Sequence, residues 1–578
     1  MAPLFVARNH SGGMAAALHI AYSRFVIYDR WLESSPLDAP IPVSNTTLRA
    51  IFARRGVDTA EKFTRFVSPT LADLHDPSTI HGIDSACDRI FRAIRDRETI
   101  VIYGDYDVDG VTSIVLLQTV LRSIGADPAF VVPHRLVDGY GLKMEVLERV
   151  LADRNVRLVI TVDCGITSVE PVRLAIERGI DVIITDHHLP PGTLPSAAAV
   201  LNPKQEGCAY PFKELAGVGV AFKLCCELIR RSGKKISTES LLKIAAIGTV
   251  ADVAPLIGEN RVIARLGLDG LADTKNRGLR ALLRRVGLQG RPLRATDVGF
   301  KIGPRINAAG RLASADTAIR LFAASDDDQA WQICQELDRL NAERQEIEAQ
   351  VREVAMQNVR GDERILVLAG QQWHKGVLGL TAGRIAQQLH RPALVLSIDG
   401  ENAVGSGRSI TTINLHEQLE AVADLFTHFG GHEFACGFSL PAKNVDKLRA
   451  RLEANFASLD DDLFRRDAHV DGSLTLADVD RDFVFAHEML QPFGAGNLQP
   501  VFVIRRARVT GKRPFAEDCC ELKLEDETGS GAAVLWPSVK SLASSINGVP
   551  LDFLVTIEAD GWSEIGGRMS VVDARTAE

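Results

Sequence analysis

The sequence predicts an α/β protein with two α/β lobes joined by a long helix, followed by a small β-rich unit that is a barrel or a sandwich. From about residue 98, short apolar runs of strand type alternate with segments of helical period. Residues 326–360 contain no glycine or proline and are largely polar, which is typical of a helix connecting two lobes. From residue 467 onward, short apolar runs separated by turn residues indicate the β-rich unit.

The composition is that of a globular chain with several folding units. A length of 578 residues corresponds to about three or four domains. Hydrophobic residues make up 46% of the chain, and no apolar run reaches the roughly 20 residues that a membrane-spanning helix requires. The nine cysteines are scattered without a C-x-x-C pair, so neither a zinc ribbon nor a disulfide framework is expected. A reducing compartment, the cytoplasm, fits best.

The net charge of −8 taken alone argues against a nucleic-acid-binding protein. Two local stretches are nevertheless basic. Residues 277–294 hold six arginines and no acid, and residues 505–513 hold five basic residues and no acid. Such stretches are usually solvated faces, and the alternative is a groove that follows a nucleic-acid backbone.

The first lobe shows strand and helix signals in βαβ order. The expected strands are "TIVIYG", "DPAFVVP", "VRLVITVD" and "IDVIITDHH". The expected helices begin at Val111 and Lys143 and cover about 169–178, 216–231 and 239–250. This repetition implies a parallel sheet with helices on both faces.

The second lobe is a shorter α/β unit. Strands are expected at "RILVLAG" and "RPALVLSID", a helix at about 376–389, a glycine-rich turn at "VGSGRS", and further helices to about 457. The predicted organisation is a disordered leader (1–45), an N-terminal extension with the first lobe (46–325), the connector helix (326–360), the second lobe (361–460) and the β-rich domain (467–578).

The stretch "GDYDVDG" places Asp105, Asp107 and Asp109 at alternate positions before Gly110. This matches the first half of a calcium-binding EF-hand loop. The match fails at the twelfth position, where an EF-hand has a bidentate glutamate and this chain has Leu116. The flanking signals instead place the aspartates at a turn between a strand and a helix.

Three strands of the first lobe end in potential metal ligands: Asp105 and Asp107, then Asp163, then Asp186, His187 and His188. In doubly wound sheets the carboxyl ends of the strands share one edge, so these groups should converge. One aspartate after a strand is usually a helix cap, and a histidine pair is usually a hydrogen-bonded loop feature. Three such ends in one unit favour a metal site.

Clustered carboxylates repel one another and raise each other's pKa, and divalent cations relieve this repulsion. More carboxylates than one ion needs, plus an imidazole, indicate two Mn²⁺ or Mg²⁺ ions sharing a bridging aspartate. Such pairs cleave phosphoesters. The cluster therefore predicts a phosphodiesterase.

The motifs also carry a family resemblance. "GDYDVDGVTS", "VDCG", "TDHH" and "IGTVADV" resemble the four motifs of the DHH phosphoesterase superfamily. "GPRINAAGR", "WHKGVLGLTAGR", "GSGRS" and "FGGHEFACG" resemble its RecJ branch with the companion DHHA1 domain, and "PFGAGNLQPVF" is similar to the segment leading into an OB-type β-domain. The resemblance runs from about residue 45 to the C-terminus. It implies a single-stranded-DNA-specific 5′–3′ exonuclease with two Mn²⁺ or Mg²⁺ ions, acting in DNA repair and recombination.

The resemblance also assigns residues. The implied metal ligands are Asp105, Asp107, Asp163, His187 and Asp252. The implied catalytic residues are His188, beside the phosphate, and Asp109, as a ligand or a neighbouring acid. The residues implied to hold substrate phosphates are Arg305, Arg311, Ser406, Arg408 and His432. The alternative for the arginines is a salt bridge between domains. Arg135 has no firm role, because His134 replaces a smaller polar residue before it.

Two other functions remain open at this stage. One is a DHH phosphodiesterase of short oligoribonucleotides or cyclic dinucleotides, which generally needs little beyond the two α/β lobes. The other is a non-catalytic Cdc45-like replication scaffold, which would be expected to have lost metal ligands. The resemblance further implies single-stranded DNA as the substrate, with a single-strand binding protein and a RecQ-type helicase as candidate partners and no membrane association.

Overall fold

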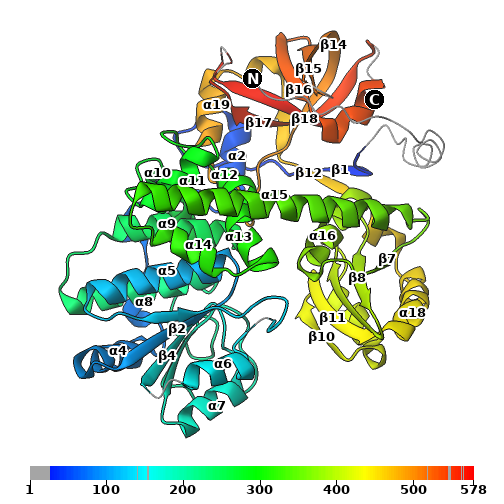
Figure 1. Ribbon diagram of the computed structural model, residues 1–578. Helices are drawn as coiled ribbons and strands as arrows, with labels where there is room; N and C mark the ends of the chain where they lie inside the picture. Colours follow the sequence, from blue (N-terminus) through cyan, green and yellow to red (C-terminus); the bar gives the residue numbers. More distant parts are fainter. Residues whose placement is uncertain are drawn as a thin grey trace.

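The computed structural model describes residues 27–577 except 140, 153–154, 517–518, 545–547, 562 and 564. Figure 1 shows the long helix α15 (Asp327–Gln357) running from the first α/β lobe to the second, with the β-rich domain on its other side. The predicted arrangement of two α/β lobes joined by one long helix is confirmed. Within the predicted leader, residues 1–26 lie outside the described residues. Strand β1 (Arg30–Glu33) is ordered, because it pairs in parallel with β12 (Asp467–Val470).

The first lobe contains the predicted parallel sheet. Its strand order is β3-β2-β4-β5-β6, and every pairing is parallel. The strands are β2 (Thr99–Gly104), β3 (Ala129–Val131), β4 (Val156–Val162), β5 (Asp181–Thr185) and β6 (Ala199–Leu201). The central strands are almost wholly buried, as expected for strands covered by helices on both faces.

The helices of the first lobe cover this sheet (Figure 1). They are α4 (Ile83–Asp96), α5 (Val108–Ser123), α6 (Met144–Leu151), α7 (Val169–Glu177), α8 (Gly217–Ser232), α9 (Thr238–Ala251), α10 (Gly258–Leu271), α11 (Arg277–Arg285), α12 (Ala295–Asp297), a π-helical turn (Val298–Ile302), α13 (Gly303–Leu312) and α14 (Asp316–Phe322). Helices α5, α8 and α9 pack together at the centre of the largest apolar core. Helices α11, α13 and α14 pack against α15.

The second lobe has a mixed sheet in the order β10-β11-β9-β8-β7. Its elements are β7 (Leu366–Gln371), α16 (Leu378–Leu389), β8 (Ala393–Asp399), β9 (Asn402–Arg408), α17 (Leu415–Glu420), β10 (His428–His432), β11 (Ala435–Pro441) and α18 (Val445–Ala457). The expectation that "VGSGRS" is a turn is wrong, because its first five residues belong to strand β9. The glycines serve packing there: a Cβ at Gly405 would lie 2.4 Å from the Phe438 ring.

The C-terminal domain is a closed β-barrel, which decides between the two architectures that the sequence allows. Strands β14, β15, β16, β18 and β17 pair in that order, and β17 pairs back to β14. The elements are β13 (Gly472–Leu474), α19 (Arg481–Glu488), β14 (Phe502–Ala516), β15 (Cys519–Glu525), β16 (Ser530–Leu535), β17 (Leu551–Ala559) and β18 (Gly567–Thr576). The topology is consistent with an OB fold.

The N-terminal helices share one apolar core with this barrel rather than with the first lobe. Phe52 of α2 (Thr46–Arg54) and Phe63 of α3 (Ala60–Val67) belong to the same buried cluster as Phe502 and Phe553 of the barrel. Buried Asp573 of β18 accepts hydrogen bonds from the backbone of the N-terminal strand segment and from the Trp31 indole. The two ends of the described chain therefore fold together.

The basic stretch 277–294 is a solvated face with acidic partners. The ion pairs join Arg280 to Asp327, Arg285 to Asp338, Arg291 to Asp297, and Arg294 to Glu488. Because most of these charges are matched within the protein, the contacts favour the solvated face over the alternative groove. The nine cysteines are free thiols. Of the helices that the structure describes, none combines the length and apolar character needed to cross a bilayer.

Candidate metal centre and active site

The first two predicted ligands lie at the turn between β2 and α5. Asp105 follows the strand and is 3% exposed. Asp107 caps the helix: its Oδ1 accepts the backbone N–H groups of Asp109 at 2.9 Å and Gly110 at 3.1 Å. The cap uses Oδ1 alone, which leaves Oδ2 for an ion. Glycine is required at 110 because a Cβ there would lie 2.3 Å from the Asp105 carbonyl oxygen.

The next two ligands arrive from β4 and α9. Asp163 follows β4 in the left-handed region at φ 59°, a conformation that aspartate tolerates better than most residues. Its carboxylate packs against Gly217, where a Cβ would lie 2.6 Å from Oδ1. Asp252 ends helix α9 as its C-cap residue. The buried strand β4 and the packed helix α9 therefore position the carboxylates of Asp163 and Asp252 at the same site.

His187 joins these carboxylates from the end of β5. Its Nε2 lies 3.2 Å from Asp163 Oδ1 and 3.9 Å from Asp109 Oδ2, and its Nδ1 lies 4.0 Å from Asp252 Oδ2. Three groups of side chains have ligand atoms close enough to hold an ion: Asp105, Asp107 and Asp163; Asp163, His187 and His188; and Asp109, His187 and Asp252. The five ligands that the resemblance implies therefore lie together, with Asp163 and His187 each in two groups.

The cluster holds more negative charge than the buried site tolerates without cations. Burial and the neighbouring carboxylates raise the pKa of Asp105 and Asp163 well above the usual range. The same causes raise the pKa of Asp252 to about 9 and that of Asp109 to about 7. Burial lowers the pKa of His187 to about 3, which keeps the imidazole neutral and able to bind a metal.

The donor set fits a hard divalent cation. Asp105 Oδ1 and His187 Nε2 are buried without a hydrogen-bond partner among the described residues, although buried polar atoms are normally paired. Coordination of a metal ion would satisfy both atoms. Several carboxylate oxygens with one imidazole match Mn²⁺ or Mg²⁺ and do not match a soft metal.

His188 is held by an aspartate that the predicted site omitted. His188 Nδ1 lies 2.7 Å from Oδ1 of Asp186, which is 1% exposed. Burial alone would lower the pKa of His188, but the hydrogen bond and charge of Asp186 raise it above its usual value. The side chain is 30% exposed, so a cationic imidazole faces the site. The signal for this pair was present in "TDHH".

Both carboxylate oxygens of Asp109 accept hydrogen bonds from the backbone of helix α8. Its Oδ2 accepts the backbone N–H of Gly217 and its Oδ1 accepts that of Val218, both at 2.7 Å. These two N–H groups belong to the first turn of α8, where a helix favours negative charge. Because both oxygens are occupied, this geometry suits positioning of α8 against the cluster better than proton transfer.

An arginine cluster faces the carboxylates. Burial and the charges of Arg135 and Arg344 lower the pKa of Arg311 to about 9, and burial and Arg135 lower the pKa of Arg408. Arg135 lies over the ring of Tyr106, the residue after Asp105, at 4.6 Å, so the structure brings this arginine to the site as well. Among the described residues none forms an ion pair with Arg311 or Arg408. An anion would relieve their mutual repulsion, and Ser406 lies two residues before Arg408 on β9.

Arg305 does not belong to this cluster. Its guanidinium pairs with Asp338 of α15 at 2.8 Å and donates to the Lys301 carbonyl oxygen. The prediction that Arg305 holds substrate phosphate is therefore not supported by its contacts, and the salt-bridge alternative describes them. The ion pair fastens α13 to the connector helix, which positions Arg311 on the same helix.

The other second-lobe candidate, His432, lies on the exposed strand β10. Burial and the charge of His188 lower its pKa, which places the two histidines within electrostatic range of each other across the lobes. Lys204 is a further cation whose charge acts on His432 and on the metal-ligand cluster. Sequence reasoning missed it, because "LNPKQ" matches no motif that we identified.

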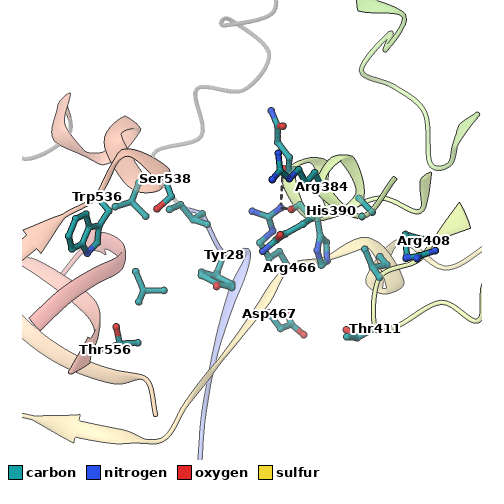
Figure 2. Close-up of a pocket in the computed structure, with 18 of the residues that line it drawn as sticks. Tyr28, Arg384, His390, Arg408, Thr411, Arg466, Asp467, Trp536, Ser538 and Thr556 are labelled. Atoms are coloured by element: carbon teal, nitrogen blue, oxygen red, sulfur yellow. Dashed lines mark hydrogen bonds between the residues drawn. The ribbon is translucent and has the colours of Figure 1, made fainter. Parts of the chain in front are cut away.

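A cavity of about 1120 Å³ lies between the second lobe and the barrel, away from the carboxylate cluster. Figure 2 shows His390, Arg384 and Arg466 on one side and Trp536 on the other, with Tyr28 between them. None of the five predicted metal ligands lines it, and Arg408 is the predicted site residue that does. The cavity therefore connects the arginine cluster with the barrel.

Comparison with known proteins identifies three domains. The DHH family N-terminal domain matches residues 99–249, the DHHA1 domain matches residues 362–458, and the RecJ OB domain matches residues 470–566. Among solved structures, RecJ in complex with Mn²⁺ from Thermus thermophilus is similar over 95% of this chain and 80% of its own, with a TM-score of 0.81 and 29% identity. A structure of exonuclease RecJ bound to manganese is 37% identical, covers 68% of this chain and 97% of its own, and has a TM-score of 0.59.

Several curated relatives share the description single-stranded-DNA-specific exonuclease RecJ. The Bacillus subtilis protein is 40% identical over 82% of this chain, and the match spans 60% of that relative's length. The Dickeya dadantii protein is 40% identical over 70% of this chain and 73% of its own length. The Salmonella typhimurium protein is 36% identical over 83% of this chain and 87% of its own length. With three matched domains and relatives covered over most of their length, this chain belongs to the RecJ family.

Proposed function

We propose that this protein is a metal-dependent, single-stranded-DNA-specific exonuclease that degrades from the 5′ end and acts in DNA repair and recombination in the cytoplasm. The observation that carries the proposal is the set of five ligands, Asp105, Asp107, Asp163, His187 and Asp252, which faces Arg311 of the first lobe and Arg408 of the second lobe. The RecJ descriptions of the relatives and of the Mn²⁺ and Mg²⁺ structures support the substrate and the metals.

The first lobe supplies the metal ligands, and both lobes supply residues that bind the substrate. In this proposal the five ligands hold two Mn²⁺ or Mg²⁺ ions, which when bound activate a water and stabilise the leaving oxygen of a phosphodiester. His188, held by Asp186, donates to the charge that develops on the phosphate. Arg311, Ser406 and Arg408 bind the 5′-terminal phosphate, and His432 contacts the strand from the second lobe. Asp109 keeps α8 against the ligands.

Digestion of end-labelled single strands tests this function directly. DNA and RNA strands carrying a label at either end are incubated with Mn²⁺, with Mg²⁺ and with EDTA. We expect mononucleotides to be released from the 5′ end of DNA with either metal, and no product with EDTA. Preference for RNA of a few nucleotides would instead favour the oligoribonucleotide phosphodiesterase, and the absence of metal-dependent cleavage would favour the scaffold.

The structure bears on both alternatives. The complete ligand cluster supports an enzyme over a Cdc45-like scaffold. The barrel, its shared core with the N-terminal helices and the cavity beside it add surface that short substrates do not need. These features support a polymer as the substrate. A single-strand binding protein and a RecQ-type helicase are the partners that we propose to test first.

The stabilisation of the folded protein by bound metal ions, measured as an increase in Tm, should depend on pH. In the metal-free protein the pKa values of Asp109 and Asp252 are about 7 and about 9, above the ~3.9 of an unfolded chain. The folded state then binds more protons than the unfolded chain, so the metal-free protein loses stability as pH rises from about 4 to about 9. Cations replace these protons. The increase in Tm on adding Mg²⁺ should therefore grow between about pH 5 and about pH 8.5, and a constant increase would contradict the assigned cluster.

The exposed basic strand of the barrel should contribute to strand binding. Arg508 is exposed, whereas Arg513 pairs with Glu521 at 3.0 Å. We expect Arg508→Ala to weaken binding of long single strands and to reduce the slope of log K against log salt by about 0.7 per lost phosphate contact. The turnover of saturating short strands should not change. Fluorescence anisotropy over a salt series measures the binding and its slope.

The control for this variant is Arg280→Ala, which removes an arginine from the other basic stretch. Arg280 already pairs with Asp327, so its loss should leave the salt slope unchanged. Equal slopes for Arg508→Ala and the unmodified protein would show that Arg508 does not bind DNA. Deleting the whole barrel is a poorer experiment, because it would uncover Phe52 and Phe63 of the N-terminal helices.

A further inference from the structure

Lys204 lies in a turn whose backbone is linked by hydrogen bonds to the histidine pair His187 and His188. It follows strand β6, which pairs with β5, and β5 leads into His187 and His188. The Asn202 side chain donates to the His188 carbonyl oxygen at 2.8 Å and accepts the Lys204 backbone N–H at 2.8 Å. Asn202 is fully buried. The backbone of Lys204 is therefore held in register with the histidine pair.

The side chain of Lys204 also points toward this pair. Its Nζ lies 3.6 Å from Oε2 of Glu214, and the imidazole of His187 hydrogen-bonds to the backbone of the next residue, Leu215. The Lys204 side chain is 22% exposed and that of Glu214 is 48% exposed. At 3.6 Å with a half-exposed partner, the ion pair is weak and leaves the ammonium group able to bind another anion.

The charge of Lys204 reaches both lobes. Burial is the largest cause of the pKa shift of His187, Asp252 and His432. The charge of Lys204 is a smaller cause, and it acts to lower all three pKa values. His187 and Asp252 belong to the ligand cluster, whereas His432 belongs to the second lobe. These charge effects agree with the position that the Asn202 hydrogen bonds and the Glu214 ion pair give to Lys204.

A lysine at this position is unfavourable for metal binding by itself. An ammonium group close to a cation site repels the incoming ions. The same charge is favourable once the substrate is present, because a phosphate oxygen can accept a charge-assisted hydrogen bond from an ammonium group. The position therefore makes chemical sense for a residue that serves the anionic substrate.

We propose that Lys204 is a further substrate-binding residue, which binds the phosphate at the metal centre from the side of His432. This inference rests on the proposed phosphodiesterase function. The lysine supplies a compact charge, while the arginine cluster supplies the forked donors that suit a terminal phosphate. Glu214 competes with the phosphate for the ammonium group and holds it in place between turnovers.

The test compares three single substitutions that each remove one charge. Lys204→Gln removes the proposed contact, and Glu214→Gln removes its partner without removing the contact. Lys213→Gln is the matched control, because the Lys213 ammonium donates to the Cys208 carbonyl oxygen at 2.7 Å and has no ion pair among the described residues. The full-length protein is used, with a 5′-phosphorylated single strand and Mn²⁺.

We expect Lys204→Gln to lower kcat/KM by about one to two orders of magnitude. Lys204→Arg should recover part of this loss, and the two control variants should remain within about threefold of the unmodified protein. Without DNA, the affinity of Lys204→Gln for Mn²⁺, measured by electron paramagnetic resonance, should increase about three- to tenfold. The affinity of the Mn²⁺-loaded variant for thymidine 5′-monophosphate should decrease.

Lys204→Gln should raise the affinity for Mn²⁺ and lower the affinity for the nucleotide. These opposite changes distinguish a substrate-binding role of Lys204 from a structural role. A lysine that only supports the fold would weaken both kinds of binding when replaced, and equal losses in Lys204→Gln and Glu214→Gln would assign the effect to their ion pair. Either result overturns the inference, as does unchanged nucleotide affinity. If the unmodified protein cleaves no strand, the proposed function fails, and the Mn²⁺ and nucleotide titrations still decide the role of Lys204.

Discussion

Asp163→Asn should lower kcat by about 10³-fold or more, because Asp163 is the carboxylate that belongs to two of the three groups of potential metal ligands. An asparagine keeps the size of the side chain but supplies no charge to bridge two cations. Single-turnover digestion of a labelled strand measures the loss. A Mn²⁺ titration should show that at least one binding site is lost, and Mn²⁺ should no longer raise Tm to the extent that it does in the unmodified protein.

The same variant should fold normally. Burial and four neighbouring carboxylates raise the pKa of Asp163, so ionising it in the metal-free protein costs free energy that asparagine avoids. We therefore expect the metal-free variant to be as stable as the unmodified protein, or more stable. Asp127→Asn, at a side chain 89% exposed in the same lobe, is the control and should change neither property. Turnover of Asp163→Asn near the normal value would remove the two-metal hypothesis.

Arg408→Ala should lower kcat/KM by about one to two orders of magnitude on strands with a 5′-phosphate, and by less on strands with a 5′-hydroxyl. Arg408 is a partly buried guanidinium whose pKa is lowered by burial and by Arg135. A terminal phosphate carries more charge than an internal one, so it gains most from this arginine. Steady-state digestion of the two substrates measures the difference.

A control separates the loss of this contact from a general loss of charge. Arg449→Ala removes an arginine from α18 of the same lobe, where it pairs with Asp446 at 2.6 Å, and should leave both substrates unaffected. Removing Arg408 also relieves repulsion within the arginine cluster, so Tm should not decrease. Equal losses on the two substrates, or digestion from the 3′ end, would show that this cluster does not recognise the 5′ terminus.

The fold of the first lobe and its ligand cluster could be predicted because both depend on local patterns. Buried parallel strands appear as continuous apolar runs, and Asp105, Asp163 and His187 come just after three of them. The carboxyl ends of parallel strands meet at one edge, so chain order alone brings these side chains together. The long helix was predictable for a similar reason, since 31 residues of helical sequence have no breaker.

Other features depend on contacts between segments far apart in the chain. Arg305 matches a family motif, but in the fold its guanidinium pairs with Asp338, which lies 33 residues away on α15. Gly405 resembles a turn residue, but it lies in strand β9. A glycine is needed there because the Phe438 ring occupies the space that a side chain would take. Neither partner can be identified from the local sequence.

The amino-acid sequence by itself therefore determined the order of the elements, through residue type and periodicity. It also indicated the family and the proposed metal ligands, through the resemblance of its motifs. Tertiary packing alone decided which charges are neutralised, that the N-terminal helices pack on the barrel, and that Lys204 pairs with Glu214, next to the residue whose backbone contacts His187. The physical reason is that burial patterns are local, whereas the Coulomb energy of a side chain depends on distances to groups anywhere in the fold.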